Sequence, residues 1–208
     1  MKTLAGRLAS CPFVAILRGV RHDEVEGIAR VLLDEGFSIL EVPLNSPDPL
    51  RSISRLSKRF GEEALVGAGT VLCAEEAAAV ADAGGRLCVA PNADARVVAE
   101  AKRRGLVTMP GIATPTEAFA MLEARADALK LFPAEAASPA VLSAMRAVLP
   151  KDTLVLPVGG IGEGNLGPWL AAGAAGFGIG SSLYQPGFTA EEVARRARGL
   201  LSAWRAVK

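Results

Sequence analysis

The feature that most constrains the fold of this chain is the alternation of short apolar runs with longer, amphipathic, alanine-rich stretches from one end to the other. The apolar runs lie at residues 13–17, 39–44, 65–71, 87–90, 106–109, 128–132, 154–158 and 177–180. Because each run is almost continuously apolar, it is typical of a strand buried on both faces, as the strands of a parallel sheet are. The pattern therefore predicts an α/β protein.

Helix signals stand between the runs. Asp23 and Glu24 open a segment that ends at Gly36, and Thr114 followed by Pro115 is typical of a helix N-terminus. Parallel strands joined by helices form either an open doubly wound sheet or a closed (β/α)₈ barrel. Dividing 208 residues among eight units gives 26 residues for each, and this even spacing favours the barrel. No break in composition indicates a second domain, so we expect a single domain over residues 1–208.

The charge balance excludes several classes of partner. Lys and Arg total 23 against 22 for Asp and Glu, a net charge of +1, so the chain has no electrostatic footprint for nucleic acid or an anionic membrane. Arg7 and Arg18 interrupt the N-terminal apolar stretch, which argues against a signal peptide. No uncharged apolar stretch of about 18 residues is present, so we expect a cytoplasmic protein that does not span a membrane.

The cysteines and the histidine do not predict a metal site. Cys11, Cys73 and Cys88 are odd in number and lack CxxC spacing, which disfavours a disulfide framework or structural zinc. His22 is the one histidine, and a lone histidine is more often a surface residue than a ligand. We therefore expect chemistry that uses no metal and no cofactor.

Lys130 is the lysine that lies inside an apolar run, between Leu129 and Leu131. Burial of an unpaired ammonium is unfavourable, so its pKa falls and the amine becomes neutral. A neutral amine attacks carbonyl carbon, as Schiff-base lysines do. The alternatives are a lysine that extends outward between helices and a structural ion pair.

Glu41 is the carboxylate inside an apolar run, and it could transfer protons opposite Lys130 if both side chains point into the barrel. The alternative is a buried ion pair between Lys130 and Glu41 without chemistry. Arg18 ends another run, where it suits a carboxylate or phosphate, although a salt bridge at the rim explains it equally well.

The last two runs end in glycine-rich segments, residues 158–162 and 178–182. Glycine lets the backbone approach an anion, and barrel enzymes frequently bind phosphate after strands seven and eight. Glycine also serves tight loops, so each segment alone is a weak signal. No Walker A or GxGxxG sequence is present, which leaves nucleotide binding unsupported.

Seven stretches together resemble the bacterial 2-keto-3-deoxy-6-phosphosugar aldolases. They are AILRG (15–19), EVPLNSP (41–47), VGAGTVL (66–72), PGIATPTEA (110–118), ALKLFPAE (128–135), VGGI (158–161) and GIGSSLY (178–184). They occur in family order over nearly the whole chain. The resemblance implies a class I aldolase on a (β/α)₈ barrel, a homotrimer, acting on a phosphorylated 2-keto-3-deoxy sugar acid in carbohydrate metabolism.

The resemblance also implies roles for individual residues. Lys130 would form the Schiff base, and Glu41 would be the acid/base carboxylate. Substrate contacts would come from Arg18 and Thr70. Phosphate contacts would come from Gly160, Gly180 and Ser181.

Two positions bear on the branch within this family. The gluconate branch typically has arginine where Asn45 stands and threonine where Val158 stands, so both positions resemble the galactonate branch. The two substrates differ at C4, and loss of one hydroxyl donor at Val158 could change which epimer is held. We therefore expect the galactonate form as substrate, in galactonate degradation.

Other functions stay open at this point. The chain could be a gluconate-specific or dual-specificity aldolase, which a comparison of the two epimers distinguishes. It could also be a non-catalytic barrel that senses a sugar phosphate, although a sensor does not need Lys130 and Glu41. A phosphate-binding isomerase barrel would not need the lysine.

Overall fold

The computed structural model describes residues 3–208, and its strands follow the predicted apolar runs. Residues 1 and 2, part of the domain expected over 1–208, lie outside the described residues. The strands are β1 (Phe13–Ile16), β2 (Ile39–Pro43), β3 (Leu65–Gly69), β4 (Leu87–Val89), β5 (Val107–Met109), β6 (Gly111–Ile112), β7 (Leu129–Leu131), β8 (Val155–Pro157) and β9 (Phe177–Ile179). All eight runs are thus confirmed as strands, and β6 is a short addition after Pro110.

Helices separate most of the strands. They are α1 (Leu4–Ser10), α2 (Val25–Asp34), α3 (Pro49–Phe60), α4 (Ala74–Asp82), α5 (Ala95–Arg103), α6 (Pro115–Glu123), α7 (Pro139–Arg146), α8 (Leu166–Ala171) and α9 (Ala190–Val207), with a 3₁₀ helix, η1 (Ala134–Ala136). The predicted start of α6 is confirmed: the Thr114 hydroxyl accepts a hydrogen bond from the Glu117 N–H, and the Glu117 carboxylate accepts one from the Thr114 N–H.

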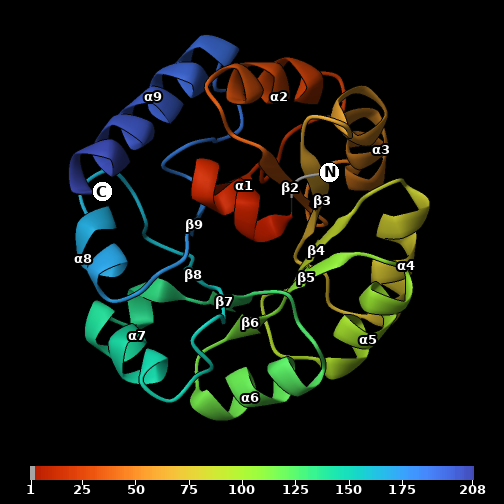
Figure 1. The fold of residues 1–208 in the computed structure, drawn as a ribbon. Coiled ribbons are helices and arrows are strands. Elements are labelled where there is room, and N and C mark those ends of the chain that lie inside the picture. Colours follow the sequence, from red (N-terminus) through yellow and green to blue (C-terminus); the bar gives the residue numbers. More distant parts are fainter. Residues whose placement is uncertain (1–2) are drawn as a thin grey trace.

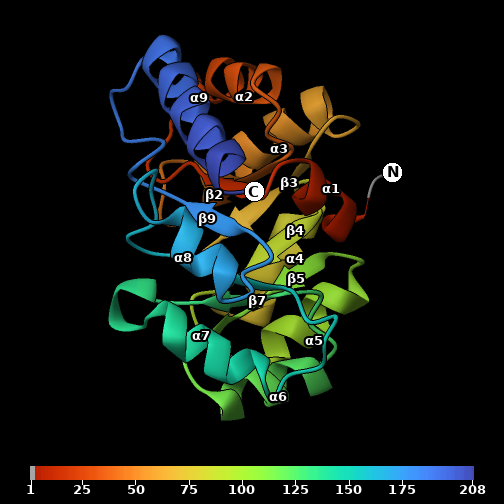
Figure 2. The ribbon, with the colours of Figure 1, turned by 60° about the vertical axis from the view of Figure 1, so that its left-hand side comes forward.

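The strands form a curved sheet in which every pair is parallel. One ladder has the order β5-β4-β3-β2-β1-β9, and a second has the order β6-β7-β8. A parallel bridge between Val158 and Gly178 joins the end of β8 to β9. Helices α2 to α9 lie in a ring around the strands (Figure 1), and α9 packs beside α2 on the outside (Figure 2). The predicted α/β architecture with parallel strands is confirmed.

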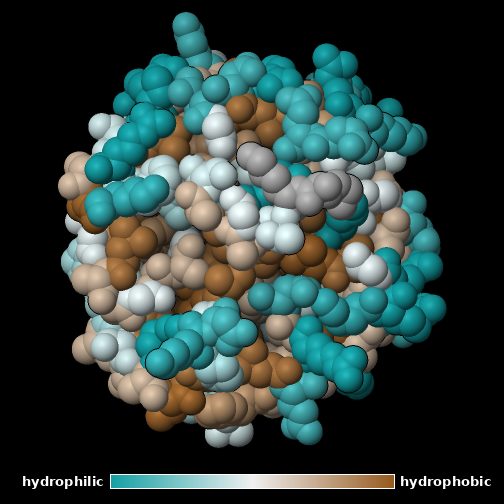
Figure 3. All heavy atoms as spheres, in the orientation of Figure 1, coloured by the Kyte–Doolittle hydropathy of each residue, from teal (hydrophilic) through white to brown (hydrophobic). Residues whose placement is uncertain are grey.

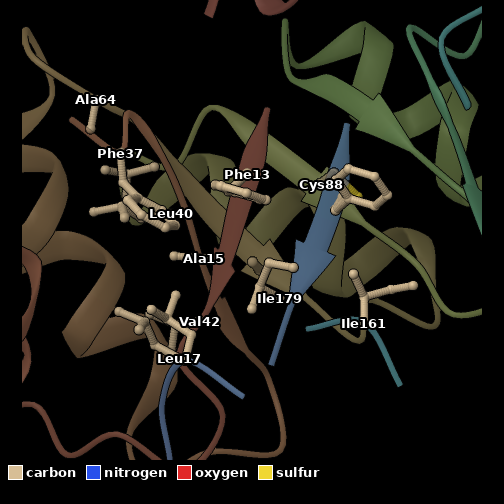
Figure 4. Packing of buried hydrophobic residues seen from close by; sticks show 14 of the residues in the cluster. Phe13, Ala15, Leu17, Phe37, Leu40, Val42, Ala64, Cys88, Ile161 and Ile179 are labelled. Carbon is tan, nitrogen blue, oxygen red and sulfur yellow. The ribbon is translucent and has the colours of Figure 1, made fainter. Parts of the chain in front are cut away.

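Alternate residues of each strand face opposite sides of the sheet, which divides the buried residues into two clusters. Phe13, Ala15 and Leu17 pack in the outer cluster between strands and helices, close to Phe37 and Leu40 (Figure 4). The inner cluster contains residues in or next to the strands and one helix residue: Val14, Ile39, Leu65, Leu87, Val89, Met109, Ala128, Leu156 and Leu8. Leu8 belongs to α1, which lies across the centre of the ring (Figure 1) and covers the N-terminal ends of the strands.

The surface follows the same division. On the face seen in Figure 3, hydrophilic side chains occupy much of the rim over the helices, and hydrophobic side chains show nearer the middle.

Cys11, Cys73 and Cys88 are all free thiols. Among residues 3–208, no helix has the length and apolar character needed to cross a membrane.

Replacement of Leu8 by alanine should destabilise the protein. The side chain is 3% exposed and fills the end of the inner cluster, so Leu8→Ala should lower the free energy of unfolding by about 2–5 kcal/mol. Urea unfolding followed by circular dichroism measures the change. Val148→Ala, at a residue that is 58% exposed, is the matched control and should change it by less than about 0.5 kcal/mol. Similar effects of the two substitutions would show that α1 does not anchor the inner cluster.

Candidate active site

Strand alternation places two ionisable side chains among the inward-facing residues. Glu41 lies two residues after Ile39 in β2, and Lys130 lies two residues after Ala128 at β7. Ile39 and Ala128 belong to the inner cluster, so the side chains two positions later face the same interior, nearer the C-terminal ends of the strands. Glu41 is 2% exposed and Lys130 is 5% exposed.

Glu41 lies in a space that the chain leaves free at Gly69. A Cβ atom at Gly69 would lie 2.6–2.8 Å from the Glu41 carboxyl group, so a larger residue there would displace it. Within the described residues, Oε2 of Glu41 has no hydrogen-bond partner. Burial raises the pKa of Glu41 above its ordinary value, and the positive charges of Lys130 and Arg18 oppose this rise. Glu41 is therefore suited to hold and release a proton.

Lys130 lies in an environment that disfavours its charged form. Burial lowers the pKa of Lys130, Arg18 acts in the same direction, and Glu41 opposes both. Its Nζ atom lies 4.5 Å from the centroid of the Phe132 ring. Since the side chain is buried, it does not extend outward to solvent between helices. Among residues 3–208, Lys130 also has no carboxylate within ion-pair distance, although Glu41 affects its pKa through space.

Thr70 follows β3 directly and has a strained backbone. Its φ of 59° lies in the left-handed region, which is a genuine outlier for a β-branched residue. Residues held in this region concentrate at functional sites. Thr70 adjoins Gly69, which faces the Glu41 carboxyl group, so the strain lies next to the buried acid.

A cavity of about 420 Å³ opens at the C-terminal ends of β1, β8 and β9. The predicted residues that line it together are Arg18, Val158, Gly160, Gly180 and Ser181. Lys130, Glu41, Thr70 and Asn45 are not part of its lining. Lys130 adjoins it through Phe132, and Glu41 does so through Ile16, its register partner on β1; both Phe132 and Ile16 line the cavity.

Hydrogen bonds within the chain fix the glycine-rich loop after β8. The side chain of Asn165 accepts a bond from the Gly162 N–H (3.0 Å) and donates one to the Gly160 carbonyl (2.8 Å). The Ser182 hydroxyl donates to the Ile161 carbonyl at 2.6 Å, which joins this loop to the segment after β9. Gly159 and Gly160 have φ values of 108° and 64°, which favour glycine. The cavity thus offers backbone groups in a fixed arrangement, as an anion site requires.

The loop after β2 holds the segment that follows β1. The Arg18 guanidinium donates to Oδ1 of Asn45 at 2.7 Å, and the Gly19 N–H donates to the Ser46 hydroxyl at 2.9 Å. Asn45 therefore lies against Arg18, the cation of the cavity, and acts on it directly. The sequence around Asn45 does not indicate this effect on Arg18; the hydrogen bond in the structure does.

Sequence reasoning assigned no individual role to several residues that line the cavity, among them Phe132, Glu135 and Ser182. Phe132 lies two residues after Lys130, so strand alternation alone could have placed it on the same side. Glu135 lies on the 3₁₀ helix η1 and Ser182 in the turn after β9, where strand periodicity does not apply. The one feature of the sequence that could have indicated Glu135 is its charge, a few residues after a buried strand.

Residues 4–198 match the family described as KDPG and KHG aldolase. A protein of Rhizobium meliloti (strain 1021) named probable 2-dehydro-3-deoxy-6-phosphogalactonate aldolase is 47% identical over 94% of this chain and 92% of its own length. A solved structure titled as native KDPGal covers 100% of this chain and 98% of its own, with 42% identity and a TM-score of 0.94. A KDPG aldolase from Legionella pneumophila, solved with pyruvate captured as a covalent carbinolamine intermediate, is 25% identical, covers 100% of this chain and 98% of its own, and has a TM-score of 0.80.

The raised pKa of Glu41 makes stability depend on pH. The folded protein holds the Glu41 proton more tightly than the unfolded chain, so wild type loses stability as pH rises from about 4.5 towards the raised pKa. Gln does not titrate, so Glu41→Gln should gain thermal stability relative to wild type between pH 4 and pH 8, by about 2–4 °C for each ~1 kcal/mol. The Glu41→Gln variant keeps Lys130 and Arg18, the two charged residues that act on Glu41.

Thermal unfolding followed by circular dichroism at both pH values measures this difference. Glu62→Gln is the matched control, since Glu62 is exposed and precedes β3, away from the interior where Glu41 lies. A difference in Tm between wild type and Glu41→Gln that stays constant from pH 4 to pH 8 would contradict the argument.

Proposed function

Because the chain belongs to the KDPG and KHG aldolase family, and is therefore an aldolase, we propose that it cleaves 2-dehydro-3-deoxy-6-phosphogalactonate to pyruvate and glyceraldehyde 3-phosphate. The observation that carries the proposal is the pair of buried groups, Lys130 with a lowered pKa and Glu41 with a raised one, on the inward face beside the cavity. An amine nucleophile and a proton carrier are what a class I aldolase needs.

The first step forms the Schiff base. The neutral Lys130 amine adds to the C2 ketone of the substrate and gives a carbinolamine, which loses water to form an iminium ion. The iminium is an electron sink two carbons from C4. The burial that keeps the amine neutral supports this role, and so does the covalent pyruvate intermediate of the similar enzyme from Legionella pneumophila.

The second step breaks the C3–C4 bond. Glu41 takes the proton of the C4 hydroxyl, directly or through one water, and the C3–C4 electron pair moves into the iminium to leave an enamine. Glyceraldehyde 3-phosphate departs with C4 as its aldehyde carbon. The enamine is then protonated at C3, and water hydrolyses the resulting iminium to pyruvate and free Lys130. The raised pKa of Glu41 suits an acid that must also return a proton.

The two ends of the substrate are assigned to different groups. Arg18 and Thr70 orient the carboxylate end, and the backbone of Gly160 and of Gly180-Ser181 holds the phosphate. The glycine-rich lining of the cavity supports the phosphate assignment, and the strained backbone of Thr70 supports a functional role at that position.

The epimer preference is assigned to Val158, and Asn45 is assigned to the support of Arg18. Val158 is 5% exposed and lines the cavity at the end of β8, where its methyl groups cannot donate a hydrogen bond. Asn45 contacts Arg18 at 2.7 Å, so its effect on substrate passes through that guanidinium. The galactonate name of the similar protein from Rhizobium meliloti favours the same epimer.

The architecture and setting of the enzyme complete the proposal. We take the strands as a closed (β/α)₈ barrel in one domain over residues 1–208, with β5 and β6 as one strand interrupted at Pro110; the bridge from Val158 to Gly178 supports closure. The chain would assemble as a homotrimer and act in the cytoplasm in galactonate degradation, without a metal or cofactor.

Borohydride trapping tests the Schiff base. Incubation with pyruvate and sodium borohydride should add one reduced pyruvate to the peptide that contains Lys130, as detected by mass spectrometry. Lys130→Ala should abolish the adduct and lower kcat for cleavage by about 10⁴-fold or more. Lys102→Ala, at a lysine that is paired with Asp127 outside the site, is the matched control and should keep both. Cleavage that survives Lys130→Ala would exclude the mechanism.

The epimer assignment predicts a change of preference in Val158→Thr. Wild type should have the higher kcat/KM for the 6-phosphogalactonate form, measured by pyruvate release from both epimers. The new hydroxyl should shift the ratio towards the 6-phosphogluconate form by about tenfold, the scale of one neutral hydrogen bond. Asn45→Ala should lower kcat/KM for both epimers alike. A wild type that prefers the gluconate form, or a ratio that only Asn45→Ala alters, would refute the assignment.

A further inference from the structure

Glu135 places a carboxylate inside the cavity that the proposed function assigns to the phosphate end. It lies on η1, directly after β7, and its side chain covers Gly159 and Gly160. A Cβ atom at Gly160 would lie 2.8 Å from Cγ and 3.3 Å from Cδ of Glu135. A Cβ at Gly159 would collide with the carboxylate itself. The glutamate side chain thus fills the space above both glycines.

The backbone that carries Glu135 is fixed to the same loop. The Ala134 N–H donates to the Val158 carbonyl at 2.9 Å, and the Ala136 N–H donates to the Pro133 carbonyl at 3.0 Å. Ala134 is 3% exposed, so it anchors η1 in the core while its neighbour Glu135 remains exposed. The backbone of Glu135 therefore keeps a defined position relative to Val158 and the glycines.

The carboxylate has no partner within the part of the chain that the structure describes. Neither a hydrogen bond nor an ion pair to Glu135 is present among residues 3–208. Among the described residues that line the cavity, Arg18 is the one cation and Glu135 the one carboxylate. A carboxylate beside a bound phosphate is unfavourable by charge alone, so this arrangement needs a compensating contact.

A hydroxyl group of the ligand would supply that contact, because an ionised carboxylate accepts strong hydrogen bonds and donates none. The proposed substrate has hydroxyls at C4 and C5. The C4 hydroxyl gives its proton to Glu41, on the inward face of β2. The C5 hydroxyl is adjacent to the phosphorylated C6, and Gly160, one of the two glycines that Glu135 covers, is assigned to the phosphate.

We propose that Glu135 is a specificity-determining residue whose carboxylate accepts a hydrogen bond from the C5 hydroxyl of the 6-phosphorylated sugar acid. This inference rests on the proposed function. In the reverse reaction the same hydroxyl is the C2 hydroxyl of glyceraldehyde 3-phosphate. Glu135 then selects 2-hydroxyaldehydes over aldehydes that carry the phosphate alone.

The test measures aldol addition of pyruvate to two aldehydes, glyceraldehyde 3-phosphate and 3-oxopropyl phosphate, which lacks the 2-hydroxyl. Wild type should prefer the hydroxylated aldehyde in kcat/KM. Glu135→Ala should lower kcat/KM for glyceraldehyde 3-phosphate by about 10- to 100-fold, the range for a hydrogen bond to a charged group, and leave that for 3-oxopropyl phosphate unchanged or raised. Glu135→Gln keeps an acceptor oxygen and should retain part of the preference.

Glu62→Ala is the matched control, because Glu62 is exposed and precedes β3, away from the C-terminal ends of the strands. Equal losses for the two aldehydes in Glu135→Ala would assign Glu135 to support of the glycine loop and overturn the inference. An unchanged preference would also overturn it. Unaltered thermal unfolding of the variant shows that it is folded.

The pyruvate half-reaction separates this inference from the proposed function. Borohydride trapping of pyruvate on Lys130 needs no aldehyde, so Glu135→Ala should trap as much as wild type. Loss of trapping in wild type would remove the proposed function and this inference together. Normal trapping with an unchanged aldehyde preference in Glu135→Ala would remove this inference alone.

Discussion

The protein depends on two ionisable groups, one basic and one acidic, that are buried on the inward face of the sheet without forming an ion pair. A direct ion pair between Lys130 and Glu41 would restore ordinary charge states to both and leave neither reactive. Their separation leaves burial as the main influence on each, with the pKa of the amine lowered and that of the carboxyl raised. The surrounding structure serves this arrangement: Gly69 leaves room for the carboxyl group, and the Phe132 ring lies beside the amine.

Much of this could be predicted from sequence because it depends on the period of the apolar runs. A strand buried on both faces has an almost continuous apolar sequence, so the eight runs identify the strands, and a charged residue within a run stands out. Lys130 and Glu41 were found in this way, and strand alternation explains why they share an interior. The capping residues of α6 were equally clear, since Thr114, Pro115 and Glu117 act over one turn of the chain.

Other features depend on contacts between distant segments and carry no local signal. Helix α1 has only seven residues and is held by Leu8 in the inner cluster, and no helix was predicted there from the sequence. The bond from Arg18 to Asn45 joins residues that are 27 positions apart, and its formation depends on the pairing of β1 with β2. The left-handed backbone of Thr70 contradicts local preference, so no propensity argument could predict it. The position of Glu135 over Gly159 and Gly160 depends on the loop after β8, which is distant in sequence.

The position of α1 has a kinetic meaning. Leu8 and its neighbours fill the interior at the N-terminal ends of the strands, so in the proposed reaction ligands approach Lys130 from the opposite ends, through the cavity that Phe132 lines. In the proposed reaction the phosphorylated fragment lies in this cavity, while the pyruvate fragment is attached to Lys130. Release of products is then ordered: the aldehyde leaves first and pyruvate second. In the direction of synthesis, pyruvate must bind to the lysine before the aldehyde occupies the cavity.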